Sequence, residues 1–324
     1  MKEERQTYPI VSICCMAYNH APYLRKCFEG FLMQEPPTGV SADDPWYEIL
    51  IHDDCSTDGT TEIIKEYAAK YPDKIFPLYE EENQYSKGKV IDAYNYNRAK
   101  GRYIAVCEGD DYWTDPCKIR KQVDFMESHP DYSVCTHGCT IYDTRSETQI
   151  LSMDFAAYEK AVSKTKDGLT FNISDFFEGH YFQPLTSLFR VSVYDQKWCE
   201  IYRYYRDTHE MYHLLRAGKG YWMNFDGGVH IKHGRGVSSS IGTNRERSLE
   251  EREHVSELYL HNRRDMDLRM YLEKILLWNY DVYKREEKIQ EFNIIMKPYW
   301  KSSPILAIRV YCTILKRKIN GAIH

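Results

Sequence analysis

The first 130 residues alternate short apolar runs with longer segments in which apolar residues recur every three or four positions. Residues 8–15 and 47–52 are near-continuous apolar runs rich in β-branched side chains, which predicts strands covered on both faces. Runs at 74–79 and 103–107 predict two further strands. The helical spacing between these runs predicts helices over residues 23–34, 60–68, 90–100 and 118–128.

This alternation is typical of an α/β fold with a parallel sheet that is wound right-handedly. Three polar segments, at 16–20, 52–58 and 108–111, directly follow predicted strands. In open parallel sheets ligands bind beyond the carboxyl ends of the strands. We therefore expect the three polar segments to meet at one edge of the sheet and to form the site.

After residue 130 the pattern becomes richer in strands, with runs at 133–142, 186–193 and 220–225 separated by helical stretches. We interpret this part as the second half of the same domain, packed on the first sheet. A charged helical segment starts at about residue 249. The predicted organisation is an α/β domain over 1–240, with halves at 1–130 and 131–240, and a helical extension over 241–324.

Charge and composition narrow the function. The chain has 324 residues and a formal net charge of −5, which argues against nucleic acid as its partner. The charged N-terminus does not resemble a secretory signal, and no apolar run reaches the roughly 18 residues of a membrane span. With ten cysteines and no export signal, we expect free thiols and a cytoplasmic location. The pair Cys135 and Cys139 lacks a second ligand pair, which disfavours a zinc site.

The segment 108–111 places three carboxylates, those of Glu108, Asp110 and Asp111, at the end of a strand. Like charges this close repel one another and lose hydration free energy when they are buried. A divalent cation would relieve both costs, and oxygen ligands favour Mg²⁺ or Mn²⁺. The alternative is a solvated acidic loop without an ion.

Three motifs together resemble the family 2 glycosyltransferases, which have the GT-A fold and invert the anomeric configuration. They are the segments 11–19 (Val-Ser-Ile-Cys-Cys-Met-Ala-Tyr-Asn), 52–60 (His-Asp-Asp-Cys-Ser-Thr-Asp-Gly-Thr) and 101–111, which ends in Glu-Gly-Asp-Asp. The resemblance covers about 230 residues in order and spacing. It implies an enzyme of the kind found in bacterial surface-polysaccharide biosynthesis. The expected donor is a nucleotide-diphospho-sugar, with UDP as the expected nucleotide.

The resemblance also assigns roles to individual residues. Asp111 is the first candidate for the metal ligand, Asp110 the second, and Glu108 stands where the family commonly has Asp. Asp54 would accept a hydrogen bond from the base, while Asp53 and Asp58 would support the turn. The nucleotide-binding set that the resemblance implies is Ala17, Tyr18, Asn19, Asp53, Asp54, Asp110, His233 and Arg235.

The acceptor side is expected in the second half. Residues 183–190 resemble the segment that lines the acceptor in this family, and 230–239 resemble the basic, glycine-rich loop that closes over the donor diphosphate. Asp207 opens a predicted helix eleven residues before Gly218, at the spacing of the family's catalytic base. Asp207 could instead serve as a partner of the helix dipole. Glu210 lies one turn along and is the alternative base.

The resemblance implies a single displacement in which a carboxylate removes the proton of an acceptor hydroxyl on a glycan or a lipid-linked glycan. Two other functions stay open. A nucleotidyltransferase would also use an α/β sheet and a carboxylate-bound metal, although the turn after the first strand lacks the usual glycine-rich phosphate loop. A non-catalytic protein could retain the nucleotide-sugar pocket alone.

The C-terminal segment becomes basic beyond residue 294, and no acidic residue follows there. Apolar residues recur in it at spacings of three and four, which predicts an amphipathic helix with a basic flank: Ile305, Ile308, Cys312, Leu315 and Ile319. Two interpretations stay open. The segment 296–319 could lie on the anionic inner face of the plasma membrane, or the helix could dock on the catalytic domain.

Overall fold

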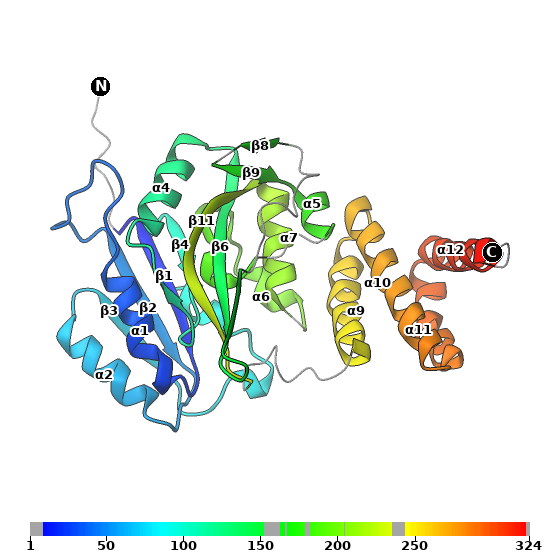
Figure 1. Ribbon diagram of the computed structural model, residues 1–324, viewed down its shortest axis with the longest axis horizontal. Helices are drawn as coiled ribbons and strands as arrows, with labels where there is room; N and C mark the ends of the chain where they lie inside the picture. Colours follow the sequence, from blue (N-terminus) through cyan, green and yellow to red (C-terminus); the bar gives the residue numbers. More distant parts are fainter. Residues whose placement is uncertain are drawn as a thin grey trace. The chain divides into compact units, whose positions relative to one another are not determined.

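The computed structural model describes residues 9–151, 163–165, 167–178, 182–203, 205–234 and 244–321 (Figure 1). The chain divides into two compact units. The first unit combines Met1–Ile201 with Glu210–Gly234, and the C-terminal unit combines Tyr202–His209 with Arg235–His324.

The N-terminal half of the first unit is a parallel sheet in the order β3-β2-β1-β4. Its strands are β1 (Val11–Ala17), β2 (Tyr47–Asp53), β3 (Ile75–Tyr79) and β4 (Tyr103–Val106). The helices between and after them are α1 (Ala21–Leu32), α2 (Thr60–Lys70), α3 (Asp92–Tyr96) and α4 (Lys118–Ser128). All residues of β2 and β4 are buried, as expected for strands with both faces covered. The predicted alternation is confirmed.

The second half continues the same sheet, which confirms the mixed α/β fold expected from the sequence. The strand β10 (Leu188–Arg190) lies antiparallel between β4 and β6 and joins the two halves. Beyond it β6 pairs in parallel with β11, and β11 pairs with β9 (Figure 1). The other strands are β5 (Tyr112–Trp113), β6 (Tyr132–Asp143), β7 (Thr148–Leu151), β8 (Ser163–Thr165), β9 (Gly168–Phe171) and β11 (Lys219–Lys232).

Three predicted elements differ from the structure. The strand expected at 186–193 is limited to β10 (Leu188–Arg190), with a 3₁₀ turn on either side of it. The strand expected at 220–225 extends through Lys232, so His230 and Ile231 lie on β11 and not in a loop. Its pairing with β6 contains three register shifts, which let one strand curve along its neighbour. The helix expected at 90–100 is shorter. Beyond it the Arg98 side chain donates to the carbonyl oxygens of Ile51 and Phe76, which holds the chain against β2 and β3.

The remaining helices of the described chain fall into two groups. Three follow the sheet strands in the second half: α5 (Ile173–Phe177), α6 (Lys197–Ile201) and α7 (Asp207–Ala217). The C-terminal unit contains α9 (Asn244–His261), α10 (Met266–Arg285), α11 (Ile289–Ser302) and α12 (Pro304–Gly321). No helix in the described part of the chain combines the length and apolarity that crossing a bilayer requires.

Candidate active site

The turns that follow β1 and β2 are fastened to each other at the carboxyl edge of the sheet. Asn19 has a left-handed backbone with φ of 56°, and its amide donates to Ser56 Oγ at 2.9 Å. Its side-chain oxygen accepts from the Thr57 amide at 2.8 Å. The His20 amide donates to Thr60 Oγ1 at 2.8 Å. These bonds fix the direction in which Tyr18 and His20 leave the first strand.

Asp53 and Asp54 are both buried, and both organise backbone. Asp53 accepts hydrogen bonds from the Ser56 amide and the Thr61 hydroxyl. Asp54 accepts from the amides of Gln84 at 2.6 Å and Tyr85 at 3.0 Å. Asp53 therefore supports the turn. The contact of Asp54 with a base stays a prediction, and the structure shows that its carboxylate also holds the segment that carries Tyr85.

Two tyrosines at this edge present their rings to solvent. The side chains of Tyr18 and Tyr85 are 47% and 40% exposed. Flat, exposed aromatic faces are suited to stacking against a nucleobase. Tyr18 was expected from the sequence, whereas Tyr85 comes from a polar loop that carried no recognisable motif.

The acidic loop approaches the first turn closely because its second residue is glycine. A Cβ on Gly109 would lie 3.0 Å from His20 Nδ1 and 3.3 Å from the Ala17 Cβ. The Gly109 amide donates to the Met16 carbonyl oxygen at 2.8 Å. The carboxylates on either side of Gly109 are thereby held beside the turn that follows β1.

Asp111 faces β11 and is fully buried. Its Oδ1 accepts from the Ile231 amide at 2.9 Å, and both of its oxygens lie 3.1 Å from His230 Nδ1. Burial raises the pKa of Asp111 to about 6, and the nearby charge of Asp110 adds to that increase, while His230 opposes it. Burial lowers the pKa of His230, but the hydrogen bond to Asp111 and the charges of Asp111 and Asp110 together outweigh it, so the pKa is raised.

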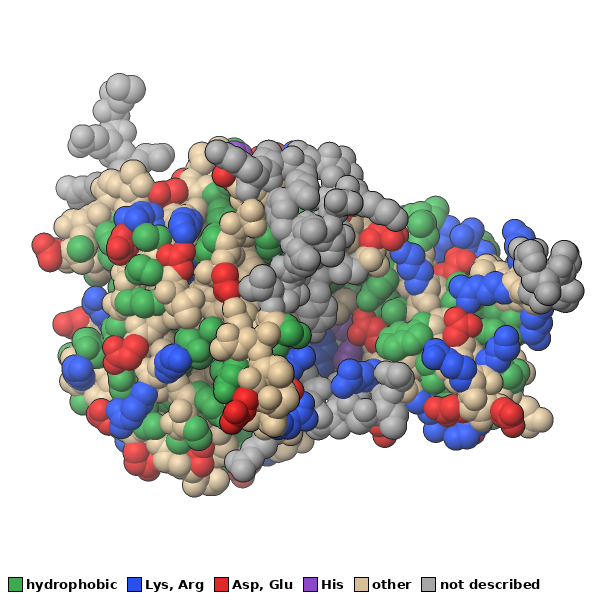
Figure 2. Space-filling model, in the orientation of Figure 1, with side chains coloured by type: hydrophobic (Ala, Val, Ile, Leu, Met, Phe, Trp, Pro, Cys, Tyr) green, Lys and Arg blue, Asp and Glu red, His purple; other side chains and the backbone are tan. Residues whose placement is uncertain are grey.

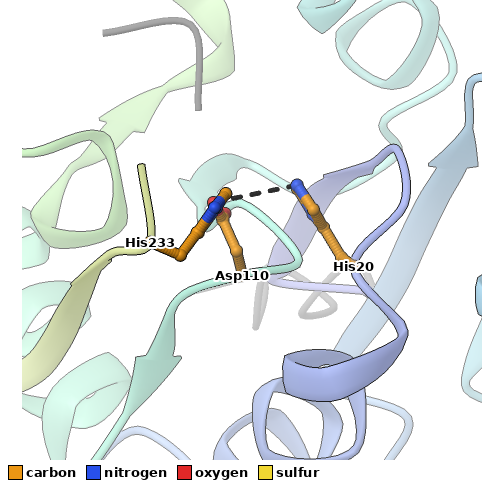
Figure 3. Close-up of side chains that lie close together, drawn as sticks. All are labelled: His20, Asp110 and His233. Carbon is orange, nitrogen blue, oxygen red and sulfur yellow. Dashed lines mark hydrogen bonds and ion pairs between the residues drawn. The ribbon is translucent and has the colours of Figure 1, made fainter. Parts of the chain in front are cut away.

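Asp110 contacts two other histidines, His20 and His233 (Figure 3). Its Oδ2 lies 2.9 Å from His233 Nε2 and 3.7 Å from His20 Nε2. Its Oδ1 and the Nδ1 of His20 are buried, and neither has a hydrogen-bond partner among the residues that the structure describes. The His233 ring stacks on Tyr23 with the ring centroids 5.3 Å apart. Residues from β1, the acidic loop and the end of β11 therefore meet at one carboxylate.

These side chains fit a divalent cation. His20, Asp110 and His233 each offer a ligand atom within 4.8 Å of the others, and so do Glu108, Asp110 and Asp111. Burial would raise the pKa of Asp110, but the His233 hydrogen bond and the His20 charge lower it. Burial lowers the pKa of His20. An ionised carboxylate and a neutral imidazole are the forms that bind metal.

The expected acceptor residues lie on or near α7. Asp207 is the first residue of this helix and belongs to the C-terminal unit, whereas Glu210 is buried and belongs to the first unit. The Asp207 side chain reaches solvent. Surrounding protein nevertheless raises its pKa, and Arg206 opposes that rise. Either role as a base stays a prediction. Arg235 lies outside the described residues.

Sequence reasoning missed two histidines of this site. His20 follows Asn19 directly, but a single histidine in a polar turn has no distinguishing pattern. His230 was placed in a basic loop without a role, because the length of β11 could not be predicted. Both become recognisable only when the first turn, the acidic loop and β11 are brought together.

The family model described as glycosyl transferase family 2 matches residues 12–198. The chain belongs to this family. The match runs from β1 into α6 and includes all three polar segments that follow the strands. It does not include β11, which carries His230. The family and the fold that the motifs predicted are therefore confirmed.

Relatives agree with this assignment over part of their length. An uncharacterised protein of Mycobacterium tuberculosis is 41% identical over 127 residues, which are 39% of this chain and 34% of that protein. A putative teichuronic acid biosynthesis glycosyltransferase of Bacillus subtilis, TuaG, is 36% identical over 118 residues, 36% of this chain and 42% of that protein. The matched segment thus spans between a third and a half of these relatives.

A solved structure shares the fold. The crystal structure of S. aureus TarS residues 1–349 in complex with UDP-GlcNAc aligns with a TM-score of 0.55 and 15% sequence identity. The alignment covers 84% of this chain and 72% of that chain. At this identity the likeness concerns the arrangement of the elements, which agrees with the sheet described above.

Proposed function

We propose that this protein is a metal-dependent, inverting glycosyltransferase that moves a sugar from a UDP-sugar to a hydroxyl of a glycan or lipid-linked glycan. The observation that carries the proposal is the meeting of Asp110, His20 and His233 at the carboxyl edge of a family 2 sheet. The Oδ2 of Asp110 contacts both imidazoles, whereas its buried Oδ1 has no partner among the described residues, which is costly unless a ligand completes it.

Asp110 is the favoured protein ligand for the metal. Its Oδ1 has no hydrogen-bond partner in the described part of the chain, whereas both oxygens of Asp111 contact His230 and one accepts from the Ile231 amide. His20 and His233 add imidazole nitrogen to the donor set, and Glu108 adds a further carboxylate. Mg²⁺ takes oxygen ligands, so two imidazoles favour Mn²⁺ over Mg²⁺. Asp111 would then not bind the metal itself, but would hold β11 in place through its contact with His230.

The donor site lies along the turns after β1 and β2. TarS, whose fold this chain shares, is described in complex with UDP-GlcNAc, which supports a UDP-sugar donor here. Tyr18 and Tyr85 offer exposed faces for the base. The other proposed nucleotide contacts are Ala17, Asn19, Asp53, Asp54, Asp110, His233 and Arg235.

The proposed chemistry is a single displacement at the anomeric carbon. A bound divalent ion supplies charge that stabilises the departing diphosphate. Asp207 removes the proton of the attacking hydroxyl, and its raised pKa brings it closer to neutrality, where a general base is effective. Glu210 is the alternative base. The description of TuaG as a teichuronic acid biosynthesis glycosyltransferase supports a cell-envelope glycan as the acceptor.

The metal assignment is tested by Mn²⁺ binding, measured by electron paramagnetic resonance or calorimetry without substrate. Asp110→Asn, His20→Asn and His233→Asn should each weaken Mn²⁺ binding, by about 10- to 100-fold for a lost ligand. His129→Asn is the matched control, because His129 bonds to the Phe125 carbonyl oxygen away from the site. Unchanged Mn²⁺ affinity in all three variants would contradict the proposed metal site.

The transferase assignment is tested separately, by turnover of a panel of nucleotide-sugars with Mn²⁺. Asp207→Asn should retain donor affinity and lose turnover. A nucleotidyltransferase would instead release pyrophosphate from a nucleoside triphosphate. A non-catalytic binding protein would show no turnover either as the wild type or as Asp207→Asn. Either result would overturn the proposal.

A further inference from the structure

Helix α12 carries an apolar stripe that the fold leaves in solvent. Ile305, Ile308 and Leu315 are 61%, 51% and 58% exposed. Cys312 and Ile319 are exposed as well. The five residues follow one another at spacings of three and four, which places them on one face of the helix. Large apolar side chains that gather on one exposed face mark an interaction surface.

The opposite face of α12 already packs the helix onto its own unit. Leu306, Ala307 and Val310 are fully buried, and Ile314 is nearly so. Arg309 and Arg317 also pair with Glu273 and Asp281 of α10, at 2.7 and 3.1 Å. Packing within the C-terminal unit therefore accounts for one face of α12 only. The stripe that the sequence singled out lies on the other face.

Basic side chains border the stripe. Arg309 follows Ile305 by four residues and Lys316 follows Cys312 by four, so each lies beside the stripe on the helix surface. Lys318 lies on the other side, three residues after Leu315. No acidic residue follows Glu291 in the chain. Figure 2 shows Lys and Arg side chains among apolar ones over the C-terminal helices.

An exposed aromatic pair lies beside the same helix. Trp300 of α11 stacks on Tyr311 of α12 with ring centroids 5.6 Å apart, and Trp300 is 45% exposed. Tyr311 is three residues after Ile308 and four before Leu315, so it adjoins the stripe. Tryptophan and tyrosine are enriched where protein meets lipid head groups.

We propose that α12 lies flat on an anionic lipid surface, with the stripe of Ile305, Ile308, Cys312, Leu315 and Ile319 inserted between head groups. An apolar stripe flanked by cations is the pattern of an interfacial helix. The same spacing also occurs in coiled coils. A second copy of this helix would however bring cationic flanks together, which is repulsive, whereas an anionic surface complements them. The proposal goes beyond the transferase function and does not depend on it.

Vesicle co-sedimentation of the full chain tests the proposal. The wild type should bind vesicles that contain about one-third phosphatidylglycerol, and should bind pure phosphatidylcholine at least about tenfold more weakly. High salt should weaken the binding, because it screens surface charge. Ile308→Glu with Leu315→Glu should abolish the binding, since it places charge in the inserted stripe. Lys316→Glu with Lys318→Glu should lower the binding to anionic vesicles only.

Ile150→Glu is the matched control, because Ile150 of β7 is 58% exposed and lies in the first unit. It should bind vesicles like the wild type, and all variants should keep the wild-type melting temperature. Equal vesicle binding by the stripe variant and the control would overturn the proposal. A second result would also overturn it: sedimentation that shows a dimer for the wild type and a monomer for Ile308→Glu with Leu315→Glu. A second copy of the chain would then cover the stripe. Turnover with a soluble acceptor should be unchanged, which separates this result from the transferase proposal.

Discussion

Asp110 and Asp111 are neighbours in sequence whose carboxylates contact different partners. Asp110 contacts His20 and His233, while Asp111 is buried against His230 and the backbone of Ile231. The sequence ranked Asp111 first as a metal ligand because it could not show which of the two carboxylates is already engaged. We therefore propose Asp110 as the metal ligand and Asp111 as the residue that positions β11.

Asp111→Asn tests this division of roles. The amide oxygen can still accept from Ile231, but the charge that raises the pKa of His230 is removed. We expect the His230 pKa, followed by NMR titration, to fall below the wild-type value, with Mn²⁺ affinity less affected than in Asp110→Asn. Asp143→Asn removes an exposed ion pair with Arg145 and should leave the His230 pKa unchanged. A lost Mn²⁺ affinity with an unchanged His230 pKa would favour the original assignment of Asp111.

Lys118 offers a second prediction at this scale. Its side chain is fully buried, its Nζ lies 3.9 Å from the Trp113 ring centroid, and no described residue is a hydrogen-bond partner of that nitrogen. Burial lowers the Lys118 pKa from 10.5 to about 7, and the charges of Cys107 and Cys135 oppose this. Because the folded pKa lies below the unfolded one, the fold loses stability as pH falls from 10.5 toward 7.

Lys118→Met should therefore raise the free energy of unfolding at pH 6 by about 2 kcal/mol, and this gain should shrink as pH rises toward 10.5. Denaturant unfolding at several pH values measures it. Lys121→Met, at a half-exposed lysine paired with Asp115, should show no such gain. A destabilised Lys118→Met at pH 6 would mean that the cation–π contact outweighs the cost of burial.

Helices and strands were predicted well where the local spacing of apolar residues determines their bounds. They were predicted poorly where pairing with a strand far away in the sequence determines them. The bounds of α4 match the predicted 118–128, because its apolar spacing repeats without interruption. The extension of β11 to Lys232 could not be predicted, because residues 226–232 pair with β6, about 90 residues earlier in the chain. This extension brings His230 and His233 to the site.

The short helix α5 gives a prediction at the scale of elements. The Asn172 side chain caps this helix by accepting hydrogen bonds from the backbone amides of Ser174 and Asp175. The Asp175 carboxylate in turn accepts a hydrogen bond from the backbone amide of Asn172. Asn172→Ala should cost about 1 kcal/mol of unfolding free energy in denaturant titration, and Asn172→Asp should cost little, because aspartate caps equally well. Equal losses in the two variants would assign the effect to something other than the cap.

The two compact units of the whole molecule do not each follow one continuous stretch of the chain. The sequence placed a helical extension after residue 240. It could not show that Tyr202–His209 joins that extension as one compact unit. The contacts responsible are distant in sequence, such as the Arg203 amide to Glu257 Oε1 at 2.7 Å and Asn262 Nδ2 to the Tyr202 hydroxyl at 3.2 Å. Contacts between residues so far apart in the sequence cannot be predicted from local sequence patterns.

Ligand linkage gives a prediction for the whole chain. If the native state binds Mn²⁺ and a UDP-sugar together, each should raise the melting temperature, and the pair should raise it further. At a ligand concentration 100 times the dissociation constant, the gain is about 2.7 kcal/mol. Calorimetry with and without EDTA measures it, with a guanine nucleotide-sugar as the comparison. A larger shift with the guanine donor would contradict the choice of UDP.

The position of β10 between β4 and β6 has a consequence for how the chain is made. On the ribosome, β1 to β4 emerge first, but β4 keeps one open edge until β10 emerges roughly 80 residues later, a delay of several seconds at ordinary translation rates. An unpaired apolar strand edge recruits other strands. During that interval the nascent protein therefore needs either a chaperone bound to it or a low rate of expression. When the protein is overproduced in another host, we expect part of it to aggregate into inclusion bodies.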